Sequence, residues 1–109
     1  MNDRPTAAQK RWREAVRELG SIISGGPAVI HHPVGRKGKH NKVDVGHWWV
    51  IPLADDEHKG LHKGDDFILE GSTRKQFEKF WFSRVLMDLE GNPDFPSEEV
   101  VDAIMDYRR

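Results

Sequence analysis

The sequence predicts a small α+β domain whose elements follow the order helix, strand, loop, strand, helix, helix, helix. Apolar residues recur at helical spacing in several segments, and two short segments are rich in β-branched and aromatic residues. With 109 residues, 37% of them apolar and 32% charged, the chain can form one hydrophobic core but not two. We therefore expect a single domain over residues 1–109.

A first helix is predicted over residues 6–19. Thr6 and Gln9 have the spacing of a capping box, in which each side chain accepts a hydrogen bond from the other residue's backbone N–H. Apolar residues then recur at helical spacing as far as Leu19, and Gly20 is placed to end the helix.

Two strands are predicted on either side of a loop. The β-branched run at 28–32 predicts the first strand, and the aromatic and β-branched run at 47–53 predicts the second, which ends at Pro52. Residues 33–46 between them are rich in glycine, lysine and asparagine, which is typical of a loop.

Three further helices are predicted in the C-terminal half. Acidic residues at 55–57 suit the start of a short helix that continues through His62. A longer amphipathic helix is predicted at about 73–89, and a last helix at about 97–107. The apolar face of the longer helix is expected to consist of Phe77, Phe80, Trp81, Val85 and Leu89.

Composition narrows the cellular setting and the kinds of site. The chain has no cysteine, which excludes disulfides and thiolate metal sites. No apolar run approaches the roughly 20 residues needed to span a bilayer, and the N-terminus lacks the hydrophobic segment of a signal peptide. We therefore expect a cytoplasmic protein without a membrane partner.

The net charge of −1 conceals an asymmetry between the two halves of the chain. Residues 1–50 carry nine Lys/Arg and four Asp/Glu, whereas residues 51–109 carry eight and fourteen. The basic half could present a positive surface to a polyanion, although an ordinary mixed surface would have the same composition.

All six histidines lie between His31 and His62. His58 and His62 are four residues apart on a predicted helix, so their rings are adjacent and could bind one divalent ion. Zinc proteases with the HExxH motif need a glutamate directly after the first histidine. Lys59 occupies that position, which excludes such a protease.

His31 and His32 lie at the end of the first predicted strand. Neighbouring strand residues point to opposite faces, which would leave one ring in the core and the other in solvent. Because Pro33 and the glycine-rich loop follow at once, both rings could instead turn toward one site. One histidine would then complete a three-histidine metal site, and the other, with a pKa near neutrality, would be a general base that activates water.

The predicted loop between the strands is basic. Its cations, together with flexible glycines, suit contact with a nucleic-acid backbone, or they form a solvated turn. These cations are Arg36, Lys37, Lys39 and Lys42. Asp44 follows them and could orient a histidine as a carboxylate behind the metal site, or it could be a simple loop charge.

The histidine pattern resembles the HNH, or ββα-metal (His-Me finger), endonucleases. Two adjacent histidines, a loop and strand, and then two histidines four apart on a helix are similar to the colicin-type nucleases. The run VIPL, followed by a histidine and an LH pair, also resembles the recombination-enhancing Ref-like nucleases of phages and prophages. The resemblance implies a ββα-metal core at about 28–63, flanked by helices at 6–20 and 73–108.

The resemblance also implies a role for each histidine of the pattern. His31, His58 and His62 would hold one divalent ion, either Zn, Mg, Mn or Ni, and His32 would be the general base. His47 would take the middle position of the motif, often asparagine in this family, where it orients the base or contacts phosphate.

The sequence departs from the family in one respect. Many relatives carry cysteines for a structural zinc, whereas Ala54 and the segment before the first strand have none. We expect packing by Trp48, Trp49 and the flanking helices to hold the motif instead. We also expect these tryptophans and Trp81 to lie in the core rather than stack on bases.

Together these observations predict a metal-dependent endonuclease that cleaves DNA, or RNA, with low sequence specificity. The resemblance adds a phage or prophage origin and a recombination protein as a partner. One alternative is a nucleic-acid-binding protein, or a subunit of a recombination complex, that does not cleave. Another is a zinc-stabilised interaction module. The nuclease requires the metal and His32, the binding protein requires the basic loop, and the interaction module requires only the metal ligands.

Overall fold

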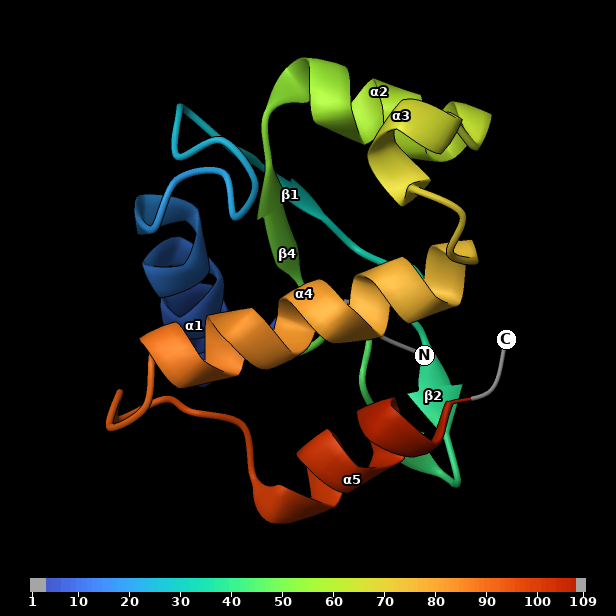
Figure 1. The fold of residues 1–109 in the computed structure, drawn as a ribbon. Coiled ribbons are helices and arrows are strands. Elements are labelled where there is room, and N and C mark those ends of the chain that lie inside the picture. The colour runs from blue at the N-terminus through green and yellow to red at the C-terminus, as the bar shows by residue number, and fades with distance from the viewer. Residues whose placement is uncertain (1–3, 108–109) are drawn as a thin grey trace.

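The computed structural model describes residues 4–107 and has an α+β fold with five helices and two small antiparallel sheets within that range (Figure 1). The helices are α1 (Ala7–Glu18), α2 (Asp55–Lys63), α3 (Asp66–Leu69), α4 (Arg74–Asp88) and α5 (Glu98–Asp106). The strands are β1 (Val29–His31), β2 (Lys39–His40), β3 (Val43–Asp44) and β4 (Ile51–Leu53). The predicted α+β class is confirmed. The predicted domain of 1–109 and the helical flank of 73–108 reach into residues 1–3 and 108–109, which lie outside the described residues.

Helix α1 was predicted over 6–19, and the structure has it over Ala7–Glu18, with Thr6 and Leu19 as its caps. Gln9 N donates to Thr6 Oγ1 at 3.1 Å, and Thr6 N donates to Gln9 Oε1 at 2.7 Å, which completes the capping box. Gly20 has a φ of +78°, and a Cβ there would lie 2.9 Å from the carbonyl oxygen of Gly25. Trp12 lies on the buried face of the helix and donates from Nε1 to the carbonyl oxygen of Trp48.

Strands β1 and β4 pair antiparallel, with His31 opposite Ile51. The prediction of a strand over 47–53 is wrong for its first half, because residues 47–49 form a turn in which Trp48 N and Trp49 N both donate to the carbonyl oxygen of Val45. Pro52 lies in the middle of β4, opposite Ile30, rather than at its end. A proline is tolerated there because both strands of a two-stranded sheet are edge strands.

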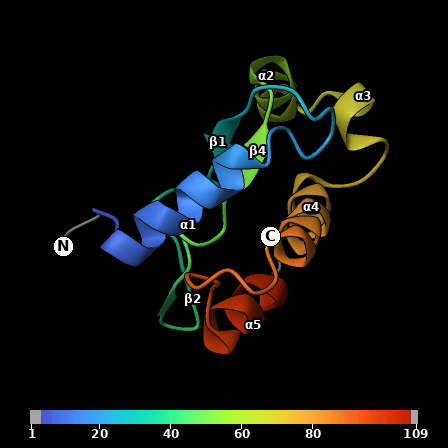
Figure 2. The ribbon, with the colours of Figure 1, turned by 90° about the vertical axis from the view of Figure 1, so that its left-hand side faces the viewer.

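The predicted loop at 33–46 contains a second, unpredicted hairpin. Strands β2 and β3 pair through Asn41 and Lys42, whose φ angles of 53° and 66° are those that a tight two-residue hairpin turn requires. His40 Nε2 lies 3.0 Å from Asp106 Oδ2, which ties this hairpin to α5. In both ribbon views the hairpin lies at the end of the molecule opposite α2 (Figure 1, Figure 2).

Helix α2 follows β4 directly. Glu57 Oε1 accepts hydrogen bonds from Ala54 N at 2.7 Å and from Ser21 Oγ at 2.6 Å, which fixes the start of the helix. Gly64 ends the helix in the left-handed conformation, with a φ of 71°. The predicted helix is confirmed, whereas α3, a short helix of four residues, was not predicted.

Helices α4 and α5 pack against the hydrophobic core. Helix α4 starts at the capping side chain of Thr73, and α5 starts at that of Ser97. The predicted apolar face of α4 needs one correction. Phe80 is 56% exposed, whereas Phe82, which was not predicted, is fully buried.

The hydrophobic core lies between α1, β4, α2, α4 and α5. Its largest fully buried side chains are Trp12, Trp49, Phe82, Ile51, Leu53, Leu61 and Ile104. The expectation that the tryptophans lie in the core is confirmed for Trp49, whereas Trp48 and Trp81 are half-buried against it. Within residues 4–107, none of the helices has the length and apolar character that crossing a bilayer requires.

Candidate metal centre

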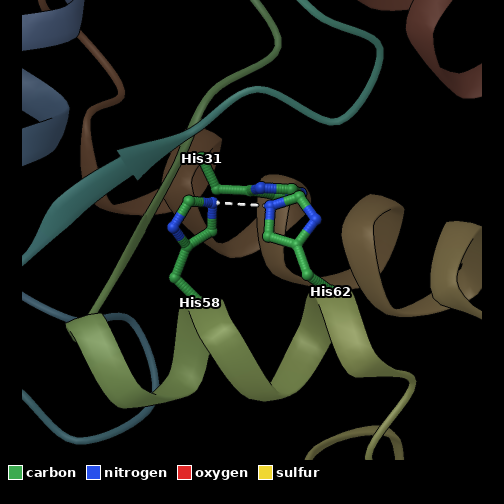
Figure 3. A group of neighbouring side chains, drawn as sticks. All are labelled: His31, His58 and His62. Atoms are coloured by element: carbon green, nitrogen blue, oxygen red, sulfur yellow. Dashed lines mark hydrogen bonds between the residues drawn. The ribbon is translucent and has the colours of Figure 1, made fainter.

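Three histidines from two elements converge on one point. Each of His31, His58 and His62 offers a ring nitrogen, and these three nitrogens lie within 4.8 Å of one another. His58 and His62 project from successive turns of α2, and their rings meet the ring of His31, which comes from β1 (Figure 3). The structure therefore brings together all three residues predicted to bind metal.

The spacing of the two helical rings suits a shared ion. His58 Nε2 and His62 Nε2 are 3.0 Å apart. Two nitrogens bound to one tetrahedral zinc at about 2.0–2.1 Å would be separated by about 3.3–3.4 Å. An ion therefore requires only a small movement of these rings.

A buried carboxylate lies behind His31. Glu78 Oε2 is 2.5 Å from His31 Nε2, and the two side chains are 0% and 1% exposed. Because a carboxylate accepts, Nε2 carries the proton, and Nδ1 is left as the ring nitrogen with a free lone pair. Histidines that bind metals commonly donate their other N–H to a carboxylate in this way.

Glu78 remains ionised despite its burial. Burial acts to raise the pKa of Glu78, but hydrogen bonds from His31 and Lys75, with the charge of Lys75, outweigh it and hold that pKa below its ordinary value. Lys75 Nζ donates to Glu78 Oε1 at 2.7 Å and to the carbonyl oxygen of Pro33 at 2.9 Å. These bonds fasten α4 to the chain just beyond β1.

Asp44 was expected to orient a histidine of the site, but in the structure its ion-pair partner is Lys39. Asp44 lies in β3, where its side chain is 75% exposed and 3.7 Å from Lys39 Nζ. The carboxylate that bonds a histidine of the site is Glu78. Its signal in the sequence is a charged residue among the apolar residues of a predicted amphipathic helix, next to Phe77.

The rings on α2 are neutral near pH 7. Burial, and then the neighbouring His31 and His62, lower the pKa of His58. Burial, Arg74 and His31 lower the pKa of His62. Metals bind the neutral form of imidazole, so both shifts favour an ion over a proton.

Arg74 borders the site and was missed by sequence reasoning. Its Nη2 lies 3.3 Å from His62 Nδ1. Arginine can only donate, so His62 Nδ1 accepts, and His62 Nε2 then carries a proton that it donates to His58 Nε2. The three side chains thus form a hydrogen-bonded chain at the point where an ion would be held.

His32 and His47 form a second group of histidines. Their ring centroids are 6.2 Å apart, whereas the neighbours of the His31 ring are His58 and His62. The expectation that His31 and His32 both turn toward one point is therefore wrong. β1 ends at His31, and His32, which follows it, has different ring neighbours.

His32 is held neutral. Burial is the main cause, followed by the charges of Arg36, His47 and Arg13, and together they lower the pKa of His32 to about 4. The expected pKa near neutrality is therefore wrong. His32 Nε2 is buried and has no hydrogen-bond partner among the described residues.

The predicted basic loop is divided by the fold. Arg36 lies close enough to His32 to shift its pKa, and it is exposed, as is Lys37. Lys39 and Lys42 belong to the β2–β3 hairpin, at the end of the molecule opposite α2 (Figure 1). Of the four cations of the loop, Arg36 is the one whose charge acts on His32.

Three imidazoles, one of them hydrogen-bonded to a buried carboxylate, form a donor set for a borderline-soft divalent ion such as zinc, nickel or cobalt. Three protein ligands leave a fourth position open for substrate or water. Comparisons of the chain with protein-family models, with curated proteins and with solved structures found no match.

Proposed function

We propose that this protein is a metal-dependent endonuclease of the HNH type, which hydrolyses phosphodiester bonds in DNA. The observation that carries the proposal is the convergence of His31, His58 and His62, with His32 directly after His31 in the chain. In this proposal β1, β4 and α2 constitute a ββα-metal motif, since α2 begins two residues after β4 and β4 pairs with β1.

His31, through Nδ1, and His58 and His62, through Nε2, would hold one divalent ion. Such an ion acts as a Lewis acid that neutralises charge on the phosphate and on the leaving 3′ oxygen. Glu78 supports the site by holding the His31 ring in the tautomer whose Nδ1 can bind a metal.

His32 would accept the proton of the attacking water. With a pKa of about 4 the imidazole is neutral at pH 7, so its lone pair is available. The charges of Arg36 and Arg13 contribute to this low pKa. A bound phosphate would offset those charges and make His32 a stronger base when substrate is present.

The different neighbours of His31 and His32 suit this division of roles. In an in-line displacement the attacking water and the leaving oxygen lie on opposite sides of phosphorus. A base and a metal ligand that have different neighbours beside one strand end could reach the two sides of a phosphodiester placed across that end.

Arginines on both sides of the site would bind the phosphate. Arg36 lies beside His32, and Arg74 lies beside His62. Coordination through His62 Nε2 would move the proton of that ring to Nδ1, which can then no longer accept from Arg74. Arg74 would keep its ion pair with Glu78, whose Oε2 lies 3.5 Å from Arg74 Nε, while its terminal nitrogens could bind the phosphate.

A second candidate is a nucleic-acid-binding protein that has the same metal site but does not cleave. The low pKa of His32 favours this candidate, because a weaker base activates water less effectively. This protein would need the metal and Arg36 but not His32.

Cleavage of supercoiled plasmid distinguishes the two candidates. Wild type would be incubated with Mg²⁺, Mn²⁺, Ni²⁺ or Zn²⁺, and with EDTA, beside His58→Ala protein purified identically to expose any contaminating nuclease. The nuclease proposal predicts nicked or linear product with at least one metal, and none with EDTA or with the variant. Binding without cleavage under every metal would overturn it in favour of the second candidate. Single-stranded DNA and RNA substrates would then define the class of nucleic acid.

A further inference from the structure

Large apolar side chains surround a groove between α2, α3 and α4, and no histidine is among the residues that line it. The groove has a volume of about 1150 Å³. Phe67 on α3 is 87% exposed, Phe80 on α4 is 56% exposed, and Ile23 is 41% exposed. Exposed apolar side chains gathered at one place mark an interaction surface more often than isolated ones do.

The floor of the groove is an aromatic cluster on α4. The ring of Trp81 packs edge-on against Phe80, with centroids 4.9 Å apart, and against Phe77, with centroids 6.4 Å apart. Phe77 is buried, whereas Trp81 is half-buried and Phe80 projects outward. Rigid aromatic side chains in such a row are typical anchors of a protein interface.

Among the described side chains that line the groove, every charged one is acidic: Asp56, Glu57, Asp65 and Glu70. Glu57 is bonded to Ser21, and Asp65 accepts from the backbone N–H of Phe67. Asp56 and Glu70 are exposed at the rim. Such a rim repels nucleic acid, and a second copy docked groove to groove would bring like charges together.

We propose that this groove binds a basic amphipathic helix of a partner protein. Apolar residues on one face of that helix would enter between α3 and α4, and its Lys or Arg residues would pair with Asp56 and Glu70. The volume exceeds the range of about 300–1,000 Å³ usual for small-molecule pockets, which favours a peptide segment.

The groove and the metal centre are separate surfaces. On α2, Asp56 precedes His58 by two residues, which is about 200° of helical rotation, so the two side chains leave the helix on nearly opposite sides. The same separation holds on α4 between Glu78 and Phe80. The partner helix can therefore bind while the histidines stay open, and this inference does not depend on the proposed nuclease activity.

Fluorescence anisotropy with synthetic peptides tests the inference on the full chain. The probe is a labelled helical peptide with leucines at positions i, i+3, i+4 and i+7 and lysines elsewhere. One comparison peptide has the same composition in scrambled order, and another has glutamate in place of lysine. The groove variants are Phe80→Ser and the double charge reversal Asp56→Lys/Glu70→Lys. The matched controls are Met87→Ser, which removes a 66% exposed residue of α4 outside the groove, and Glu98→Lys/Asp102→Lys, which reverses two charges on α5.

The basic amphipathic peptide should bind wild type more tightly than either comparison peptide. Phe80→Ser should weaken it by about tenfold or more, as expected for an interface anchor, and Met87→Ser should not. The rim reversal should transfer the preference to the acidic peptide, whereas the α5 reversal should not. Equal binding of the scrambled peptide, no binding of the amphipathic one, or no response to Phe80→Ser would overturn the inference. Self-association of the wild type that Phe80→Ser abolishes, measured by sedimentation equilibrium, would assign the groove to a second copy instead.

Discussion

Glu78 Oε2 lies 2.5 Å from His31 Nε2 inside the protein, although the two residues are 47 positions apart in the chain. Both side chains are withdrawn from solvent. The contact fixes which nitrogen of His31 can bind a metal, and Lys75 holds the carboxylate from its other oxygen. The geometry of the candidate metal centre is therefore influenced from α4, an element that supplies no proposed ligand.

The substitution Glu78→Gln tests this relationship at nearly constant volume. The neutral amide orients His31 less firmly and raises the basicity of its ring less, so zinc affinity should fall by about 10–100-fold. Lys75 also loses a charged partner, and the metal-free protein should become less stable by about 1–3 kcal/mol. Calorimetric zinc titration and urea unfolding measure the two effects.

Glu90→Gln is the matched control, because Glu90 is exposed just beyond α4 and its loss removes the same charge. Glu90→Gln should leave both the zinc affinity and the free energy of unfolding unchanged. Unaltered zinc affinity in Glu78→Gln would show that the carboxylate only stabilises the fold.

The roles of His32 and His62 can be separated in one comparison. His32→Ala should retain metal and lose about 10²–10⁴-fold in cleavage rate, because only proton transfer is removed. Its residual activity should rise with pH as hydroxide replaces the base. His62→Ala should lose both the metal and cleavage.

Metal content and cleavage would be measured on the same samples of the two variants. Loss of metal from His32→Ala would place His32 among the ligands. Full activity of His32→Ala would exclude it as the base.

Arg36 and Lys37 should contribute more to DNA binding than Lys39 and Lys42, because the hairpin lies at the end opposite α2. Arg36→Ala/Lys37→Ala should reduce the slope of log affinity against log salt by about 1.8 if two phosphate contacts are lost. Binding to a duplex would be followed by anisotropy from low to moderate salt.

The double variant Lys39→Ala/Lys42→Ala is the control, since it removes the same charge from a different place. It should leave the slope nearly unchanged. A larger loss in this control would move the nucleic-acid surface to the β2–β3 hairpin.

Gly46 holds the turn that carries His47. A Cβ at this position would lie 2.4 Å from the carbonyl oxygens of Arg36 and Gly35, so the chain would have to shift where it passes His32. Gly46→Ala should destabilise the protein by about 1–3 kcal/mol, the usual range for overpacking. Urea unfolding would measure this loss.

Gly26→Ala is a suitable control, because the nearest atom to a Cβ there is Ser24 Oγ at 3.9 Å. Gly26→Ala should change the free energy of unfolding little. Equal stability of the two variants would mean that the turn at Gly46 adapts easily and does not fix the position of His47.

The parts of the fold that the sequence predicts are those with local causes. The capping box of α1, the acidic first turn of α2 and the glycine at 20 depend on residues a few positions apart. The turn at 47–49 was predicted as a strand because aromatic and β-branched residues suit a buried turn as well as a strand. Local pattern likewise gave no reason to prefer Phe82 over Phe80 as a buried residue of α4, since the choice depends on what packs against the helix.

In the candidate site, too, the contacts with local causes could be predicted and the long-range contacts could not. His58 and His62 are neighbours through helical spacing alone, so their pairing could be predicted. Glu78 contacts His31 and Arg74 contacts His62 only because α4 lies near β1 and α2 in the fold. No pattern among neighbouring residues in the sequence predicts these contacts. The separation of Arg36 from Lys39 likewise depends on the unpredicted hairpin.

The proposed metal centre requires that His31, His58 and His62 together bind a single ion. Calorimetric titration of zinc into wild type and His58→Ala measures this binding, with His40→Ala as a control that removes a histidine bonded to Asp106 instead. Wild type and His40→Ala should bind one ion per chain with equal affinity. His58→Ala should bind more than about 100-fold more weakly, since the loss of a ligand exceeds the loss of a group behind it. Equal zinc affinity in wild type and His58→Ala would contradict the three-histidine centre.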